Sequence, residues 1–472
     1  MMLRNTLRDS RLLVSLSAPI AGIQLAQVAL TTTDLLMMGL ISVQAIAAGG
    51  LAITLYNQIR TMCVGTVTAV SNLVAMSVGR GESRGAHEGF DDQTRDEVRR
   101  IVRSGLLVAT LVGLAAAGVL TALSFALAWF GQDAEVLALA QPMMIALAFG
   151  LIPMLWLNVL RQFAVGMRRP GSLMWVTIGS IGVNAALNGA FIYGWLGLPA
   201  LGLTGIGLAT ATVNLLTCAA YYGIVRRDHT LAQFMSVRFW RADTHTTREI
   251  LRLGIPISLT YGSEAGIFSV AALIMGTFGP ATLAAHNVVI QLTYIAFQIA
   301  IGLSHGASTL VSGTIGQGKP GEARHIARTA HTLGALIMAV IGTVYLIAPQ
   351  WVLYPFLDPA QAADVLPIAQ TLLYIAVLQQ LFDCAQNIGV GLLRGLSDTR
   401  SGFRITLVGY WVLGLPVLLV CAYPLGLGGY GVWLGLSAGL ALTAWLLHRR
   451  FNAGLDALPD RVLRARPDSD VK

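Results

Sequence analysis

The sequence predicts an all-α polytopic membrane protein with twelve transmembrane helices in two pseudo-symmetric six-helix lobes. Three observations predict this fold class: the composition, the number of long apolar segments, and an internal repeat. Hydrophobic residues make up 55% of the 472 residues and charged residues only 11%, against about 25% charged residues in an ordinary soluble domain. A chain with so little charge cannot cover its surface in water. Soluble enzymes, nucleic-acid binders and disordered scaffolds are therefore excluded, and the lipid bilayer is the expected partner.

Twelve apolar segments are long enough to cross a bilayer as helices. The segments are continuously apolar rather than alternating, which favours helices over a β-barrel. They comprise residues 12–40, 46–78, 101–130, 136–160, 172–193, 203–225, 250–278, 282–315, 332–354, 366–393, 405–423 and 431–447.

The basic residues indicate which way these segments face. Every Lys and Arg except Arg60 falls in the two tails or in alternate connections, and Arg161 is assigned to the connection between the fourth and fifth segments. We expect the protein to lie in the cell inner membrane. The positive-inside rule then places both termini and the central loop in the cytoplasm. Contact with anionic lipid explains the net charge of +8 without any nucleic acid.

The two halves of the chain form a repeat. Residues 16–86 align without a gap on residues 253–323, so that Pro19 meets Pro256 and Gly65 meets Gly302. Since each half contains six segments, an even number, both halves start on the same side of the membrane and the repeat is parallel. Two such lobes around a central cavity are typical of transporters.

The repeat sets the predicted domain boundaries. We expect an N-terminal lobe at 1–226, a cytoplasmic inter-lobe loop at 227–247, a C-terminal lobe at 248–450 and a cytoplasmic tail at 451–472. Nothing in this organisation requires a second chain, so we expect the protein to act as a monomer.

Five ionisable residues lie within the predicted segments and away from their cytoplasmic ends: Asp34, Arg60, Glu264, His286 and Asp383. Each costs free energy in hydrocarbon, so each should face a cavity or a partner. We expect Arg60 to be a counter-ion for Asp34 or Glu264.

Uncharged polar residues recur at helical spacing beside these acids and predict the lining of a cavity. Asn184 and Asn188 either hydrogen-bond between helices or line a proton path beside Asp34. The other residues of this predicted lining are Gln24, Gln27, Tyr261, Gln291, Tyr294, Gln298 and Gln379.

Two acids in the second half suggest where a coupling ion binds. Glu264 and Asp383, with neighbouring amide and phenol oxygens, suit a hard cation such as Na⁺; alternatively, one of the carboxyl groups carries H⁺. The offset between the halves is 237 over the first stretch and 225 from about residue 101 onward, so the repeat places Gln27 opposite Glu264 and Asn158 opposite Asp383. The acids therefore have neutral counterparts. We therefore expect the C-terminal lobe to carry the coupling ion and Asp34 to serve protons or substrate.

Pro19 and Pro256 occupy equivalent positions in the repeat. A proline inside a helix removes a hydrogen bond and permits a kink. Bending of the first and seventh segments at these residues is a candidate gating motion.

These residues together resemble the multidrug and toxic compound extrusion (MATE) family, in particular its NorM-like branch. The resemblance covers about residues 10–450 and rests on "TTTDLLMMG" around Asp34, "YGSEAG" around Glu264, "GVNAALNGAFIYG", "FDCAQNIGVGLLRGLSDTR" around Asp383, and the paired loops "GRGESRGA" and "GQGKPGEA". Arg60 is not part of the family pattern.

The resemblance implies an antiporter that exports lipophilic, often cationic compounds in exchange for Na⁺ or H⁺ by alternating access, without a cofactor. It implies that Glu264 and Asp383 form the cation site and that Asp34 takes part in proton or substrate binding. Two alternatives were weighed. A flippase of lipid-linked precursors would be expected to line its cavity with many basic residues. An intramembrane enzyme would need a catalytic set such as HExxH, which the sequence lacks.

Overall fold

The computed structural model describes residues 2–85, 90–130, 133–197, 199–357 and 362–458, and these ranges are helical with no strand. The helices of the first half are α1 (Met2–Gly39), α2 (Val43–Ser83), α3 (Asp92–Ala126), α4 (Ala134–Phe149), α5 (Leu151–Gly166), α6 (Gly171–Tyr193), α7 (Leu203–Arg227) and α8 (His229–Ala232). Those of the second half are α9 (Thr244–Gly276), α10 (Pro280–Gly316), α11 (Pro320–Ile347), α12 (Pro349–Leu353), α13 (Ala362–Gly395), α14 (Thr399–Leu407), the π-helix η5 (Val408–Gly414), α15 (Leu415–Ala422) and α16 (Gly428–Asp456). Residues 459–472 of the predicted tail lie outside the described residues.

The predicted fold class is confirmed. Within the described ranges, 11 helices are long and apolar enough to cross a membrane, and a bent pair, α4 with α5, makes the number twelve if it is one span. The longest helix, α2, has 41 residues. At about 1.5 Å per residue it is roughly twice as long as the hydrocarbon core is thick, so it extends well beyond the core.

The fourth predicted segment, 136–160, is a broken span rather than one straight helix. Its two parts, α4 and α5, meet at Gly150 with a bend of 41°. A Cβ at Gly150 would lie 2.8 Å from the Cα of Ala211, so the chain turns where α7 passes closest. Pro153 lacks an N–H, which leaves the first turn of α5 without one of the bonds that would continue α4.

The eleventh predicted segment also departs from a regular helix. Residues Val408–Gly414 form a π-helix, η5, between α14 and α15. Pro416 follows at the start of α15 and cannot donate a backbone hydrogen bond. The extra residue per turn rotates the side chains before it relative to those after it, a feature often found at functional sites.

The chain folds as two compact units that divide α1 and α9. One unit contains residues Gly22–Gly262, and the other contains Met1–Ala21 together with Ser263–Lys472. The unit borders thus fall inside two helices, close to Pro19 and Pro256, rather than in the central loop. The lobe boundaries at 226 and 248 stay a prediction about the repeat.

Two glycines show why the first part of α1 packs in the unit of residues 263–472 and the first part of α9 packs in the unit of residues 22–262. A Cβ on Gly65 of α2 would lie 2.6 Å from the Cα of Ser258 in α9, and one on Gly302 of α10 would lie 2.8 Å from the Cβ of Ala21 in α1. The repeat register that pairs Gly65 with Gly302 also pairs Ala21 with Ser258. The same close helix crossing therefore occurs once in each unit.

The predicted inter-lobe loop belongs to the unit of residues 22–262. Phe234 is fully buried there, and the carbonyl oxygen of Gln233 accepts a 2.8 Å hydrogen bond from Arg99 of α3. Helix α9 begins at Thr244, earlier than predicted, because Asp243 caps it by accepting from the backbone N–H of Thr246 at 2.8 Å. This backbone hydrogen bond and a second one from the Thr246 hydroxyl lower the pKa of Asp243.

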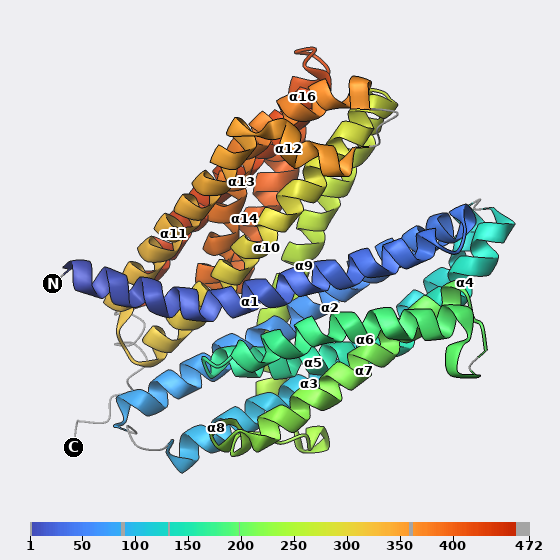
Figure 1. Cartoon of the computed structure of the whole chain (residues 1–472). Coiled ribbons are helices and arrows are strands. Elements are labelled where there is room, and N and C mark those ends of the chain that lie inside the picture. Colours follow the sequence, from blue (N-terminus) through green and yellow to red (C-terminus); the bar gives the residue numbers. More distant parts are fainter. Residues whose placement is uncertain (1, 86–89, 131–132, 198, 358–361, 459–472) are drawn as a thin grey trace, which may run out of the picture. The chain divides into compact units, whose positions relative to one another are not determined.

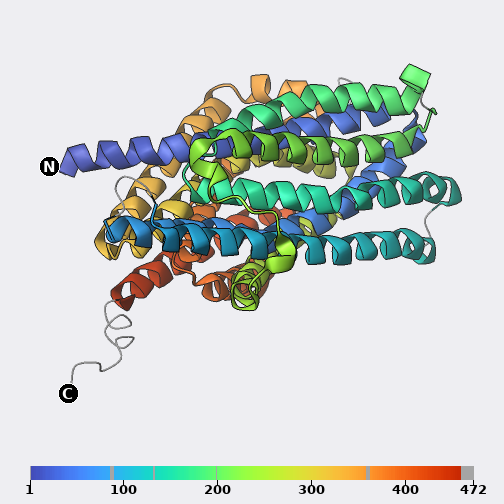
Figure 2. The same cartoon turned by 90° about the horizontal axis from the view of Figure 1, so that it is seen from below.

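Each unit is a bundle of long helices. In the unit of residues 22–262, α2, α3, α5, α6 and α7 run side by side, as both views show (Figures 1 and 2). In the other unit, α13 packs against α10, α11 and α16 (Figure 1).

The crossing at Gly65 yields a stability prediction. We expect Gly65→Ala to destabilise the protein by about 1–3 kcal/mol, because the new Cβ overlaps the α9 backbone. Gly50→Ala, on the same helix α2 with no other atom near its Cβ position, should leave stability unchanged. Thermal unfolding of both variants in detergent measures the difference, and equal transition temperatures would contradict the proposed crossing.

Candidate cation and substrate sites

The first candidate site is centred on Asp34 of α1, which is only 6% exposed. Its Oδ1 accepts hydrogen bonds from the side-chain amides of Asn184 and Asn188 of α6, both at 2.8 Å, and its Oδ2 accepts one from Thr210 of α7 at 3.1 Å. All three donors are neutral, so the carboxylate is held in place while its charge is left unpaired. The structure thus brings Asp34 together with both predicted asparagines.

The oxygens around Asp34 suit a cation. The Oδ1 atoms of Asn184 and Asn188 are buried and have no hydrogen-bond partner among the described residues. Because the amide nitrogen and oxygen of Asn are assigned from the hydrogen-bond network, a rotation of either amide would present oxygen in place of nitrogen. One carboxylate and two amide oxygens are ligands that hard cations such as Na⁺ prefer.

A cavity of about 80 Å³ opens beside Asp34, within the unit of residues 22–262. This volume is too small for a drug-sized molecule, whose pockets are about 300–1,000 Å³, but it holds an ion, water or one functional group. Apolar side chains of α2, α4 and α5 form part of its wall. Its polar lining consists of Gln27, Thr31, Asp34, Tyr56, Asn57, Arg60, Asn158, Thr210 and Asn214.

Arg60 of α2 lines this cavity with Asp34 but is not ion-paired to it. The Nε of Arg60 donates 3.2 Å to Oδ1 of Asn57, and no ion pair in the described part of the chain includes Arg60. The counter-ion role predicted for Arg60 stays a prediction. A single small cavity therefore carries one acidic and one basic group.

Sequence reasoning missed several polar residues of this site, among them Tyr56, Thr210 and Asn214. Tyr56 is 5% exposed and lies beside Asn214. Thr210 and Asn214 belong to a polar stripe on α7 that continues at Thr217, at the i, i+4, i+7 spacing of one helix face. That spacing could have identified Thr210 and Asn214 as lining residues. No comparable pattern identifies Tyr56, because tyrosine is common on apolar helices.

The second candidate site contains the acid pair of the other unit. Glu264 of α9 is 8% exposed, and its carboxylate interacts electrostatically with that of Asp383 of α13. Asn387 donates 3.1 Å to Oδ1 of Asp383 and also lies beside Glu264. The Oε1 of Glu264 is buried without a hydrogen-bond partner among the described residues. Two close carboxylates repel unless a cation or a proton lies between them.

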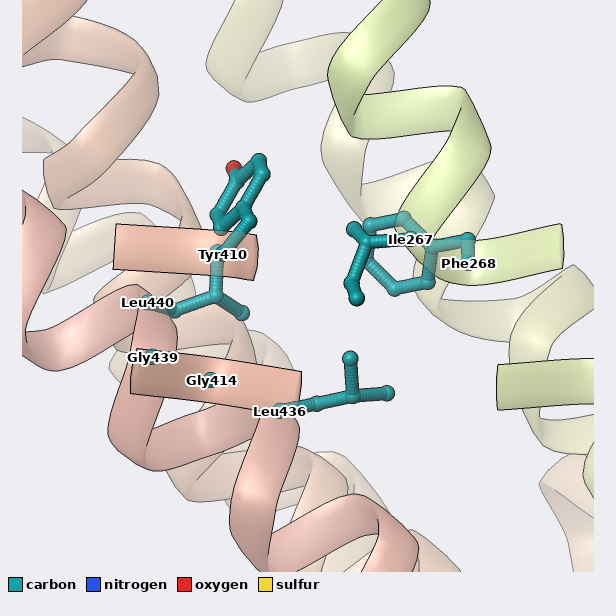
Figure 3. Close-up of a pocket in the computed structure, with 7 residues that line it drawn as sticks. All are labelled: Ile267, Phe268, Tyr410, Gly414, Leu436, Gly439 and Leu440. Carbon is teal, nitrogen blue, oxygen red and sulfur yellow. The ribbon is translucent and has the colours of Figure 1, made fainter. Parts of the chain in front are cut away.

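The π-helix η5 adds Tyr410 to this acid pair. The Tyr410 hydroxyl lies next to Glu264, and its ring lines a small apolar pocket with Ile267 and Phe268 of α9. Figure 3 shows Tyr410 and Leu436 facing Ile267 and Phe268 across this pocket. The phenol oxygen therefore joins the carboxylate and amide oxygens, a contribution that the sequence did not reveal.

Comparison with known proteins shows the family. The family profile described as MatE matches residues 19–189 and 256–420. The chain belongs to the MatE family.

Relatives in this family are similar over most of their length. A "Probable multidrug resistance protein NorM" of Rhizobium meliloti is 38% identical over 439 residues, which cover 92% of this chain and 91% of that protein. A protein of the same name from Pseudomonas aeruginosa is 37% identical over 442 residues, covering 93% of this chain and 88% of that protein.

Solved structures show the same fold. A eukaryotic MATE transporter matches with a TM-score of 0.82 at 19% identity, covering 97% of this chain and 100% of that chain. A MOP superfamily transporter from Pyrococcus furiosus also matches with a TM-score of 0.82, at 18% identity, covering 96% of this chain and 97% of that chain. The predictions of a MATE fold, of the NorM-like branch and of a transporter rather than an enzyme are confirmed.

The remaining predicted lining residues are scattered in this MatE family member. Gln291 and Tyr294 of α10 are exposed, whereas Gln298 of α10 and Gln379 of α13 are buried. Gln24 and Tyr261 are half-buried. None of these six residues is in the lining of either described cavity. Their roles in substrate binding stay predictions.

The hydrogen bonds of Asp34 yield a second stability prediction. We expect Thr210→Val to destabilise the protein by about 1.5–3 kcal/mol, the range for a hydrogen bond to a charged group. Thr212→Val is the matched control, because the Thr212 hydroxyl bonds within the same helix to the carbonyl of Leu208. Thermal unfolding in detergent compares the two variants, and equal losses would argue against the bond to Asp34.

Proposed function

We propose that this protein exports amphipathic, often cationic compounds across the cell inner membrane in exchange for Na⁺ or H⁺. Membership of the MatE family and the names of its relatives support multidrug efflux. The multi-pass fold supports the membrane location. The distribution of arginines in the sequence supports cytoplasmic termini.

The observation that carries the proposal is the Asp34 carboxylate. It is buried in a membrane-spanning helix and bonded only to neutral donors, and it faces a cavity. A charge held in this way attracts a cation or a proton strongly, and it releases one when the surroundings change. Competition between a coupling ion and a cationic substrate for such groups is the exchange that an antiporter needs.

We further propose that the two sites have different functions, one binding the coupling ion and the other binding substrate or a proton. Glu264 and Asp383, with Asn387 and Tyr410, would bind the coupling ion, since two acids and several oxygens lie together there. Asp34 would bind substrate or a proton beside Arg60. Pro19 and Pro256 would supply the bends of α1 and α9 that expose the sites to alternate sides.

The comparisons do not favour the flippase of lipid-linked precursors. The curated relatives named above are multidrug resistance proteins. Both candidate sites are also built around carboxylates, which would repel a pyrophosphate.

The first transport prediction concerns the driving ion. Purified protein in proteoliposomes should transport ethidium when it is driven by an imposed Na⁺ gradient or by an imposed pH gradient, because the carboxylates can bind either ion. The two gradients are imposed separately and the dye fluorescence is followed. Transport driven by one gradient alone identifies the coupling ion; no transport under either gradient would reject the antiporter.

The second transport prediction separates the two sites. Glu264→Gln and Asp383→Asn should each abolish coupling to the imposed ion gradient. Asp34→Asn should lower ethidium transport by about tenfold or more, which corresponds to at least about 1.4 kcal/mol. Glu135→Gln, at an exposed acid at the start of α4, serves as the control and should transport normally. Loss of ion coupling in Asp34→Asn alone would overturn the proposed division.

A further inference from the structure

In the unit of residues 22–262, Arg161 is a further arginine within an apolar helix, besides Arg60 of the cavity beside Asp34. The sequence assigned it to a connection, but it lies within α5 and is only 6% exposed. Its Nε and Nη2 atoms are both buried, and neither has a hydrogen-bond partner among the described residues. These two N–H groups lie on the same edge of the planar guanidinium and point the same way. That edge is the fork with which arginine holds an anion.

The surroundings of Arg161 supply no compensating negative charge. Within the described residues no ion pair includes Arg161, and the groups that act on it electrostatically are Arg60 and Tyr221. Arg60 has the same charge and Tyr221 is a neutral phenol at ordinary pH. An isolated buried guanidinium is costly, and a bound anion would offset that cost.

The repeat places Arg161 three residues after Asn158, the neutral counterpart of Asp383. Asn158, Arg161 and Gln162 of α5 correspond to Asp383, Gln386 and Asn387 of α13. In the second unit this helix face holds a carboxylate beside an amide donor. In the unit of residues 22–262 the same face carries Asn158 in place of Asp383 and Arg161 in place of Gln386, so the sign of the charge is reversed.

We propose that Arg161 binds a small monovalent anion, chloride, through its Nε and Nη2 atoms inside the unit of residues 22–262. The size of the ligand follows from the burial, since Arg161 is not in the lining of the cavity beside Asp34. The neighbouring amides of Asn158 and Gln162, which are 1% and 3% exposed, add polar groups next to Arg161 in the sequence of α5. The bound anion stabilises the positive charge that α5 carries next to Arg60.

The test measures stabilisation by anions. Thermal unfolding of the purified full-length protein in detergent is followed while sodium chloride replaces sodium gluconate at constant ionic strength. Wild-type protein should show a rise of several degrees in the transition temperature that saturates with chloride. Bromide should act similarly, and acetate should not.

Two substitutions locate the effect. Arg161→Gln places in α5 the residue found at position 386, and it should abolish the chloride-dependent rise. It should also make the protein more stable than wild type in gluconate, because an unpaired charge is removed. Arg100→Gln, at an exposed arginine of α3, is the control and should retain the rise. A chloride effect that persists unchanged in Arg161→Gln would overturn the proposal.

A measurement on wild-type protein does not depend on a variant that folds. The ³⁵Cl nuclear magnetic resonance line should broaden when protein is added and should narrow again when bromide competes. No broadening, or stabilisation by acetate but not by chloride, would also overturn the proposal. Either result would mean that water or a carboxylate group, rather than chloride, accepts hydrogen bonds from Nε and Nη2 of Arg161.

Discussion

The structure depends on one constraint: a charged or polar group inside the membrane must find its partners within the protein. Backbone groups meet this constraint by forming helices, and the described part of the chain contains no other regular structure. Side chains meet it only in part. Asp34 has three neutral donors, whereas Glu264 and Asp383 lie together with no basic partner among the described residues. The places where the constraint is incompletely met are the places where an ion or a substrate can bind.

The two repeats have the same backbone packing but different charged residues at equivalent positions. The glycine crossings at Gly65 and Gly302 are equivalent in register and in geometry. The charged positions are not equivalent, because Glu264 and Asp383 align with Gln27 and Asn158. Duplication therefore supplied two scaffolds of the same shape, and substitutions at a few buried positions gave each scaffold a different electrostatic character.

Much of the fold could be predicted from the sequence, because long apolar segments and repeated glycines leave few alternatives in a bilayer. The meeting of Asp34 with Asn184 and Asn188 followed from polar residues at helical spacing. Three features could not be predicted. The break at Gly150 and the π-helix at Tyr410 arise from contacts with other helices and from nearby prolines, which periodicity does not report. The burial of Arg161 was missed because a charged residue near the end of an apolar segment reads as part of a connection.

The division of α1 and α9 between the two units bears on how the chain is made. The first unit is complete only when residue 262 has been synthesised, so its helices must wait for the first half of α9. The first 21 residues, in contrast, leave the ribosome early and find their packing partners, such as Gly302, only after most of the chain has followed. A nascent chain stopped at the central loop would therefore contain the first part of α1, which belongs to the other unit, and would lack the first part of α9, which the unit of residues 22–262 needs. The unit of residues 22–262 can therefore form before the rest of the chain exists, whereas the first 21 residues must wait for Ser263–Lys472 before their own unit can form.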